Sequence, residues 1–282
     1  MIKPFLIALL LCCTCVYGAR EAKVFNLNDR LMSLQRFNIF SKDDYDARFV
    51  DLGMVRKRRI LRMAKCVASA YAGEKIPDGF RCQTSEWCKS VMFASSVLND
   101  WCYSDNGRIV FKSGLAVRIM RDESSNELVI AFPGVEDLND VAVALDAMLF
   151  GDDMRQLDEA TEIVRAISVA HDGKTVLVGH SLGGLLAAYA TISQESNYIE
   201  CYLFNPIGIP RNLFRKLDSN RIKLIKRQII TVFHPQDILR GYYFFGMSYG
   251  MSYRLDWELN VSANKAHSIN HMISMLKALS GT

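Results

Sequence analysis

Residues 179–184 read GHSLGG, between an apolar run at 175–178 and a segment of helical spacing that begins at Leu182. In this pattern a serine occupies a tight turn from a strand into a helix, and glycines stand two residues to either side because a Cβ there would collide with neighbouring backbone. The turn pushes the hydroxyl out of the sheet, and the helix directs its first N–H groups at the same point. The stretch predicts a nucleophile at Ser181, with Leu182 N–H as an oxyanion donor.

The flanking sequence has the organisation of one α/β domain. Strands joined by a polar turn, Asp122–Asn126, are expected at Gly114–Met120 and Leu128–Phe132. Further apolar runs at 175–178, 201–204 and 229–233 alternate with segments of helical spacing. Strands that are apolar throughout are typical of a sheet covered on both faces. We therefore expect an α/β fold with a mostly parallel central sheet flanked by helices.

Residues 1–18 are expected to be an export signal. Lys3 supplies the positive end and Phe5–Cys13 the apolar stretch, which is shorter than the about 20 residues that span a bilayer. A lipid anchor on Cys12 or Cys15 is the alternative. The mature chain is then a secreted single domain, 19–282, that starts near Ala19 and has a helical N-terminal extension at 19–60.

Helical spacing extends from Arg20 to Ala72. Within it, residues 56–59 read RKRR. This basic run is either a solvated face of the helix or a processing site for a protease that cleaves at basic residues. The helical face is the favoured interpretation.

Five of the eight cysteines would remain after removal of the signal, and export would place them in an oxidising compartment. Cys66 and Cys201 stand in apolar patterns and are expected to be buried thiols. Cys82, Cys88 and Cys102 flank polar, turn-like sequence and are candidates for a disulfide. Which two of them pair is left open by the sequence.

Three segments together resemble the class 3, or fungal-lipase-like, family of α/β-hydrolases. Besides GHSLGG, the segment Ala131–Val135 (AFPGV) resembles the family's Ala-Phe-x-Gly-Thr/Ser segment, which supplies the oxyanion hole. Phe204–Gly208 (FNPIG) resembles the turn after the next strand. The resemblance covers roughly residue 64 to the C-terminus. It implies an α/β-hydrolase fold, hydrolysis of lipid esters without a cofactor, and Val135 N–H as the second oxyanion donor.

A serine hydroxyl needs an imidazole to remove its proton, and in this fold the histidine comes last in the chain. His267 lies in AHSIN, residues 266–270, which resembles the family's catalytic histidine segment, and is the expected base. His271, one helical turn further on, is the alternative. His234 directly follows a strand and is interpreted as a rim or structural residue.

The imidazole in turn needs a carboxylate that fixes its tautomer. Asp237 follows the strand at 229–233 in a segment that resembles the family's strand-loop-Asp pattern, and is the expected acid. Asp218, in a charged helical stretch, and Asp256, in an aromatic stretch, are competitors.

Two residues depart from the family's pattern near the expected oxyanion hole. Val135 replaces Thr or Ser, so an assisting hydroxyl is missing although the backbone N–H remains, and Pro133 replaces a usual Arg. Loss of one oxyanion donor typically lowers the rate about 100- to 1000-fold. Slower chemistry is expected. The alternatives are a non-catalytic lipid- or protein-binding module and an acyltransferase that uses the same site.

The remaining features bear on partners. A net charge of only +4 and the lack of a recognisable module argue against nucleic acid as a partner. No metal is expected, because the sequence has no His-Glu-x-x-His and the five mature cysteines have no Cys-x-x-Cys spacing. A basic run at 211–227 and an aromatic one at 242–257 suit peripheral contact with a membrane or lipid interface, although both also fit ordinary structure. Val141–Met154 could form a short lid. The expected partner is a lipid or small ester substrate.

Overall fold

The computed structural model describes residues 47–92, 96–98, 101–104, 107–135, 155–194, 199–210, 227–237, 239, 246–247, 250–258 and 260–281. All of them belong to one compact unit, Ser41–Thr282. The expected export signal at 1–18, the suggested lid at 141–154, residues 211–226 of the basic run and residues 242–245 and 248–249 of the aromatic run lie outside the described residues.

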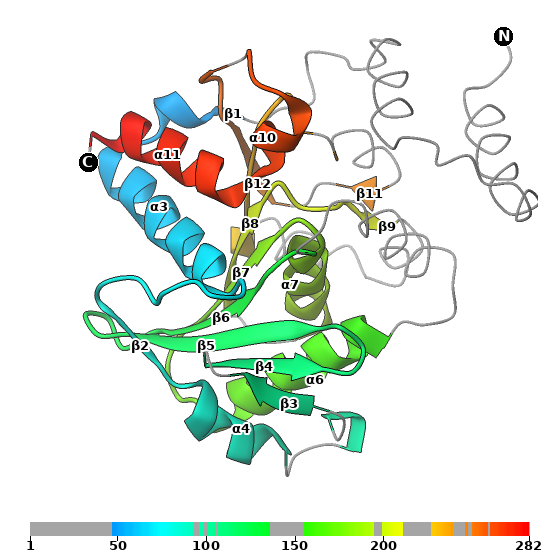
Figure 1. Ribbon diagram of the computed structural model, residues 1–282. Helices are drawn as coiled ribbons and strands as arrows, with labels where there is room; N and C mark the ends of the chain where they lie inside the picture. Colours follow the sequence, from blue (N-terminus) through cyan, green and yellow to red (C-terminus); the bar gives the residue numbers. More distant parts are fainter. Residues whose placement is uncertain are drawn as a thin grey trace, which may run out of the picture. The chain divides into compact units, whose positions relative to one another are not determined.

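A ten-stranded sheet forms the centre of this unit (Figure 1). Across the sheet the strands follow the order β1 (Ala47–Arg48), β12 (Met251–Arg254), β10 (Ile229–Phe233), β8 (Ile199–Phe204), β7 (Thr175–His180), β6 (Leu128–Phe132), β5 (Ala116–Asp122), β4 (Arg108–Phe111) and β3 (Trp101–Ser104), and β2 (Phe80–Cys82) also pairs with β5. Neighbours from β1 to β6 are parallel, and those from β6 to β3 are antiparallel. A separate short pair joins β9 (Ile209–Pro210) and β11 (Gly246–Met247) in antiparallel fashion.

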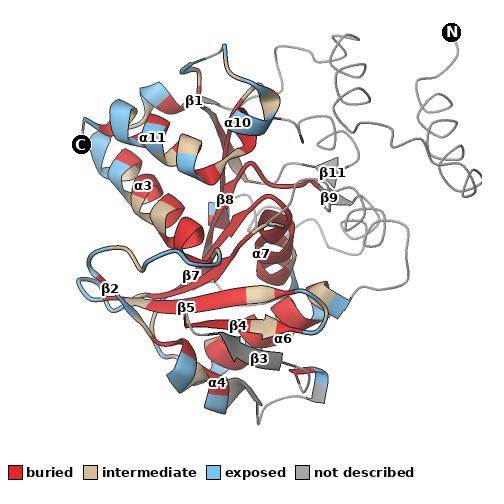
Figure 2. Ribbon diagram, viewed as in Figure 1, coloured by how far each residue is buried: buried red, intermediate tan, exposed pale blue. Residues whose placement is uncertain are grey.

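Helices cover both faces of the sheet, as the apolar strands predicted. The helices are η1 (Phe49–Asp51), α3 (Met54–Ser69), α4 (Thr84–Met92), η2 (Ser96–Leu98), α6 (Arg155–Ala170), α7 (Leu182–Ser193), α10 (Ala263–His267) and α11 (Ile269–Ser280). Figure 1 shows α3 and α11 on one face and α6 and α7 on the other. The strands between them are buried (Figure 2). None of the described helices combines the length and apolarity needed to cross a membrane.

The parallel strands end at one edge of the sheet, and this edge carries the segments that the sequence singled out. The loop from Pro133 follows β6, Ser181 follows β7, Asn205 follows β8, and Asp237 lies four residues after the end of β10. Ligand and catalytic sites of open α/β sheets lie at the carboxyl ends of the strands. The fold therefore gathers these residues although Pro133 and Asp237 are 104 positions apart in the sequence.

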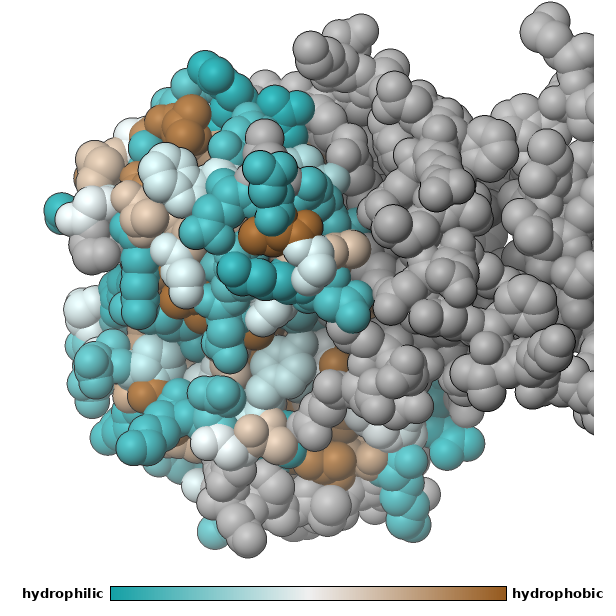
Figure 3. All heavy atoms as spheres, turned by 45° about the horizontal axis from the view of Figure 1, so that its top comes forward, coloured by the Kyte–Doolittle hydropathy of each residue, from teal (hydrophilic) through white to brown (hydrophobic). Residues whose placement is uncertain are grey.

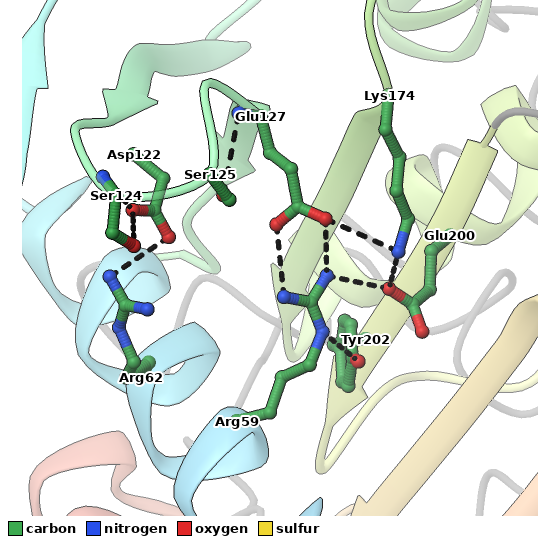
Figure 4. A network of polar contacts seen from close by, with 9 residues as sticks. All are labelled: Arg59, Arg62, Asp122, Ser124, Ser125, Glu127, Lys174, Glu200 and Tyr202. Atoms are coloured by element: carbon green, nitrogen blue, oxygen red, sulfur yellow. Dashed lines mark hydrogen bonds and ion pairs between the residues drawn. The ribbon is translucent and has the colours of Figure 1, made fainter.

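A network of ion pairs fixes α3 at the opposite edge of the sheet (Figure 4). The Arg59 guanidinium lies 2.9 Å from Glu127 and 2.7 Å from Glu200, and Lys174 pairs with the same two carboxylates. Arg59 Nε also donates to the hydroxyl of Tyr202. Burial would raise the pKa of Glu127, but the hydrogen bonds and charge of Arg59 outweigh it and lower that pKa. If α3 moved away, Glu127 and Glu200 would lose Arg59 and keep a half-buried charge without that partner, which is unfavourable. The network therefore fixes the position of α3.

Residues 56–59 lie within α3, which confirms the helical interpretation of the basic run. The expectation of a solvated face is wrong for two of the four. Lys57 is buried and donates to Val50 O at 2.9 Å, and Arg59 belongs to the network just described. One turn on, Arg62 pairs with the buried Asp122 at 2.8 Å.

The chain before α3 departs from the predicted helix. Ala47–Arg48 forms β1, paired in parallel with Tyr253 and Arg254 of β12. Edge pairing of two residues leaves no periodicity in a sequence, so the helical pattern around it decided the prediction. Phe49 and Ile60 are fully buried in the same core cluster, and α3 runs through the boundary expected at residue 60.

The expected disulfide is absent from the structure. Cys82 and Cys88 are both unpaired thiols, so no pairing among Cys82, Cys88 and Cys102 is formed. The sulfur of Cys82 instead contacts Gly107 O at 3.6 Å. Cys66 and Cys201 are buried thiols as predicted, and burial raises the pKa of Cys201 to about 12.

Candidate active site

The nucleophile turn joins β7 directly to α7, as predicted. Ser181 has φ 55° and ψ −124°, a backbone conformation that a residue with a Cβ adopts only under strain. Two hydrogen bonds hold it there: Ser181 N–H donates to Phe204 O, and Ile207 N–H donates to Ser181 O, both at 3.1 Å. The turn is therefore fixed by β8 and the loop that follows it.

The glycines of the turn are required by close backbone contacts. A Cβ on Gly179 would lie 2.2 Å from Gly183 O, and one on Gly183 would lie 2.1 Å from Phe132 O. These contacts confirm the prediction that side chains at both positions would collide with the neighbouring strand or helix.

Gly183→Ala is expected to lower the free energy of unfolding by roughly 1–3 kcal/mol, because the new methyl group meets backbone that must shift. Its closest contacts are Phe132 O at 2.1 Å and Pro133 O at 2.3 Å. Urea denaturation measures the change. Gly53→Ala is the control, because a Cβ there has no atom within 4 Å. Equal stability of the two variants would contradict the steric explanation.

The hydroxyl of Ser181 is buried, and its oxygen has no hydrogen-bond partner among the described residues. Gly134 lies against it, since a Cβ on Gly134 would be 2.7 Å from Ser181 Cβ. Val135 follows directly and is partly buried. Leu182 is the first residue of α7, where backbone N–H groups lack intrahelical acceptors. Of the two expected oxyanion residues, Leu182 directly follows Ser181 in the sequence, and Val135 directly follows Gly134, which lies against Ser181.

His267 and Asp237 form a buried pair. Nδ1 of His267 lies 2.8 Å from Oδ1 of Asp237, and both side chains are almost fully buried. The same Oδ1 accepts a hydrogen bond from Leu239 N–H at 2.8 Å. Because a carboxylate only accepts, Nδ1 carries the proton of this bond, and in the neutral imidazole Nε2 then has the lone pair. His267 is the last residue of α10 and precedes Ser268, the N-cap of α11, so it stands between two helices and not on the expected loop.

Contacts from the nucleophile turn reach the segment of His267. His180 Nε2 lies 2.8 Å from the backbone oxygen of His267, and the two rings are 4.8 Å apart between centroids. Asn205, in the loop after β8, donates from Nδ2 to Ala266 O at 2.9 Å. The histidine segment is thereby joined to the turn that carries Ser181.

The competing histidines have other partners. His234 is fully buried; its Nδ1 accepts from Gln236 N–H, and its Nε2 donates to Trp257 O at 3.3 Å. Burial lowers the pKa of His234. His271 lies 3.7 Å from Glu258. His234 therefore fits the structural interpretation.

Of the competing acids, Asp256 pairs with Arg254, and Asp218 lies outside the described residues. Within the part of the chain that is described, no group of three or more His, Cys, Asp or Glu side chains forms a potential metal site.

Figure 3 shows one face of the molecule, on which hydrophobic side chains occur as separate small groups among hydrophilic ones. Trp257, from the aromatic run, is 47% exposed.

Three residues at this edge of the sheet were not recognised from the sequence: Tyr71, His180 and Asn205. Tyr71 stands just beyond α3, and its hydroxyl lies 2.6 Å from His180 Nδ1. Asn205 has φ 40° in the turn that follows β8. Asn is among the few residues that tolerate positive φ, so an Asn directly after a predicted strand was an available signal.

A sheet whose parallel strands present a serine turn and a buried His–Asp pair at one edge defines an α/β-hydrolase fold. Comparison with protein families agrees: residues 62–282 match the phospholipase-like family described as the Tle-like phospholipase domain, and the chain belongs to that family. The lipase-like resemblance of the motifs is thereby confirmed. A comparison with curated protein sequences found no significant match.

Solved lipase structures also resemble the chain. A propeptide complex of Rhizomucor miehei lipase aligns with a TM-score of 0.47 and 13% identity over 80% of this chain and 78% of that chain. A lipase from Rhizopus microsporus var. chinensis gives 0.46 and 13% over 72% and 76%. Lip2 lipase from Yarrowia lipolytica gives 0.45 and 15% over 74% and 81%.

Proposed function

We propose that the chain is a secreted carboxylic ester hydrolase that cleaves phospholipids through an acyl-enzyme on Ser181. The observation that carries the proposal is the buried His267–Asp237 pair, which is linked through His180 to the strained turn bearing an unpartnered serine hydroxyl. A serine hydroxyl with no competing hydrogen bond and a histidine whose tautomer is fixed by a carboxylate are the two groups that nucleophilic acyl transfer requires.

In the proposed reaction Ser181 Oγ attacks the ester carbonyl while His267 Nε2 takes the hydroxyl proton. Asp237 stabilises the imidazolium that forms, and the same proton then passes to the leaving alcohol as the ester C–O bond breaks. Water, deprotonated by His267, attacks the acyl carbonyl; the bond to Ser181 Oγ then breaks, His267 returns the proton to Oγ, and the fatty acid is released. No cofactor enters either step.

The oxyanion is assigned to the backbone N–H groups of Val135 and Leu182. Gly134, directly before Val135, already lies in contact with the nucleophile. Backbone donors need no reorganisation during the reaction, so they retain most of the electrostatic benefit that a missing Thr or Ser hydroxyl would have supplemented. The valine suits a slower enzyme and not an inactive one.

The proposed substrate class is supported by the family, whose description is a phospholipase domain. Export is inferred from residues 1–18, whose positive end and apolar stretch have the composition of a signal. Peripheral contact with a lipid interface is part of the proposal, since a phospholipid substrate is presented at a membrane surface.

Covalent labelling tests the proposed function. The purified wild-type protein should react with a fluorophosphonate probe, and peptide mass spectrometry should locate the adduct on Ser181. The same protein should release fatty acid from phosphatidylcholine vesicles. Protein that is folded by circular dichroism but shows neither labelling nor release would refute the enzymatic assignment and favour a lipid-binding role.

A further inference from the structure

A continuous chain of hydrogen bonds runs beside the proposed catalytic residues. Gly134 N–H donates to the hydroxyl oxygen of Tyr71 at 2.8 Å, and this hydroxyl lies 2.6 Å from His180 Nδ1. On the other side of the ring, His180 Nε2 lies 2.8 Å from the backbone oxygen of His267. The chain thus connects the oxyanion loop, the end of α3, the nucleophile turn and the segment of the base.

For a neutral His180 ring, only one assignment of protons satisfies these three hydrogen bonds. A carbonyl oxygen only accepts, so His180 Nε2 carries the proton that it shares with His267 O. A neutral imidazole then has an unprotonated Nδ1, which accepts from the Tyr71 hydroxyl. The Tyr71 oxygen is left to accept from Gly134 N–H. The tautomer of His180 is therefore dictated by its partners.

The ring of His180 also lies against the ring of the base. The centroids of His180 and His267 are 4.8 Å apart and the planes are inclined by 39°. Burial and the neighbouring His267 lower the pKa of His180 to about 3. A neutral ring at this position does not oppose the positive charge that His267 acquires when it takes the proton, whereas a cation would.

Tyr71 is rigidly placed for this role. It follows α3, whose middle is fixed by the Arg59 network and by the Arg62–Asp122 pair. Its backbone N–H donates to Ala68 O at 3.1 Å, which continues the last turn of the helix. A Cβ on Gly134 would be 2.8 Å from the Tyr71 hydroxyl and 2.7 Å from Ser181 Cβ, so one glycine touches both.

We propose that Tyr71 and His180 are positioning residues that hold the general base and the oxyanion loop in register with Ser181. The proposal rests on the proposed function and deepens it. Tyr71 fixes the loop through Gly134 N–H, and His180 fixes the base through its backbone oxygen and ring face. Errors of about 1 Å in such alignment can lower rates by about 100-fold, so the pair matters for turnover more than for binding.

Tyr71→Phe removes the hydroxyl and leaves the ring. Steady-state hydrolysis of a short-chain p-nitrophenyl ester should show kcat lowered about 10- to 100-fold, with KM changed less than about twofold. Tyr253→Phe is the matched control, because the hydroxyl of Tyr253, in β12, also has a side-chain hydrogen bond, to Met251 Sδ at 3.7 Å, and belongs neither to this hydrogen-bond chain nor to the Arg59 network. It should keep its kcat whatever its loss of stability. A Tyr71→Phe variant with wild-type kcat, or with a loss no larger than that of Tyr253→Phe, would overturn the proposal.

Two substitutions of His180 separate the hydrogen bond to Tyr71 from the hydrogen bond to His267 O. His180→Asn keeps an oxygen near the position of Nδ1 for Tyr71 but has no donor for His267 O, whereas His180→Gln can restore that donor. We expect a larger fall in kcat for Asn than for Gln, and less than multiplicative losses when Tyr71→Phe is combined with His180→Gln. Equal kcat for Asn and Gln together with fully multiplicative losses would contradict a connected pair.

Nitrogen NMR of histidine-labelled wild-type protein tests the chain without catalysis. His180 should show a protonated Nε2 and an unprotonated Nδ1, and should remain neutral at pH 4.5. A protonated Nδ1, or titration of His180 near the ordinary histidine pKa of about 6.5, would refute the proposed chain of hydrogen bonds even if the enzyme is active. An inactive wild-type protein with the expected His180 signals would refute the proposed function and leave the hydrogen-bond assignment standing.

Discussion

Ser181→Ala is expected to lower kcat/KM for ester hydrolysis by roughly 10⁴-fold or more and to abolish fluorophosphonate labelling. The hydroxyl is the only atom removed, and it has no hydrogen-bond partner among the described residues, so its loss leaves no group unsatisfied. Alanine also accepts the φ of 55° with no more strain than serine. The melting temperature should therefore stay within about 3 °C of the wild type.

Ser280→Ala is the matched control for this substitution. Ser280, at the end of α11, is fully buried and its hydroxyl likewise has no partner among the described residues. The same chemical change there should leave both labelling and turnover intact. If Ser181→Ala hydrolyses esters as fast as Ser280→Ala, the acyl-enzyme proposal is wrong, whatever the fold.

The nucleophile turn was predictable because its requirements are local. A strand, a serine and flanking glycines lie within ten residues. Each glycine avoids a steric clash that the motif implies; a Cβ at position 179, for example, would lie 2.2 Å from Gly183 O. The strand at 229–233 was predicted with the bounds of β10, because an apolar run between polar turns permits few alternatives. Asp237 then followed from its place just after that strand.

The positioning pair was not predictable in the same way. Tyr71 and His180 are 109 residues apart, and nothing in the spacing of either segment indicates that they meet. His180 stands at a variable position of the motif, where any residue satisfies the pattern. Only the placement of α3 by the Arg59 network brings the tyrosine hydroxyl to the imidazole.

The predictions for residues 47–48 and for a disulfide were wrong for a related reason. Ala47–Arg48 becomes a strand because Tyr253 and Arg254 offer their backbone, and Cys82 stays unpaired although Cys88 follows six residues later. Both outcomes depend on which groups the fold brings together and on their geometry. Composition and spacing carry no information on either.

His267→Ala is expected to lower kcat by roughly 10⁴-fold or more, because no other group would accept the serine proton. The ring that is removed has Nδ1 bound to Asp237, and with it the carboxylate loses a buried partner. Free imidazole should restore a measurable part of the activity by filling the vacated space. Stopped assays on p-nitrophenyl acetate with and without imidazole measure both effects.

His271→Ala decides between the two histidines that the sequence left as candidates. His271 lies four residues after His267; its described contacts are with Glu258 at 3.7 Å and with the ring of His234 at 6.0 Å between centroids, and not with Asp237. Burial lowers the pKa of His271, so the side chain is neutral near pH 7 and its loss removes no fixed charge there. The variant should keep kcat within about threefold of the wild type, since it touches none of the groups that position Ser181. Should His271→Ala lose activity while His267→Ala retains it, the base is His271, and the buried pair with Asp237 is structural.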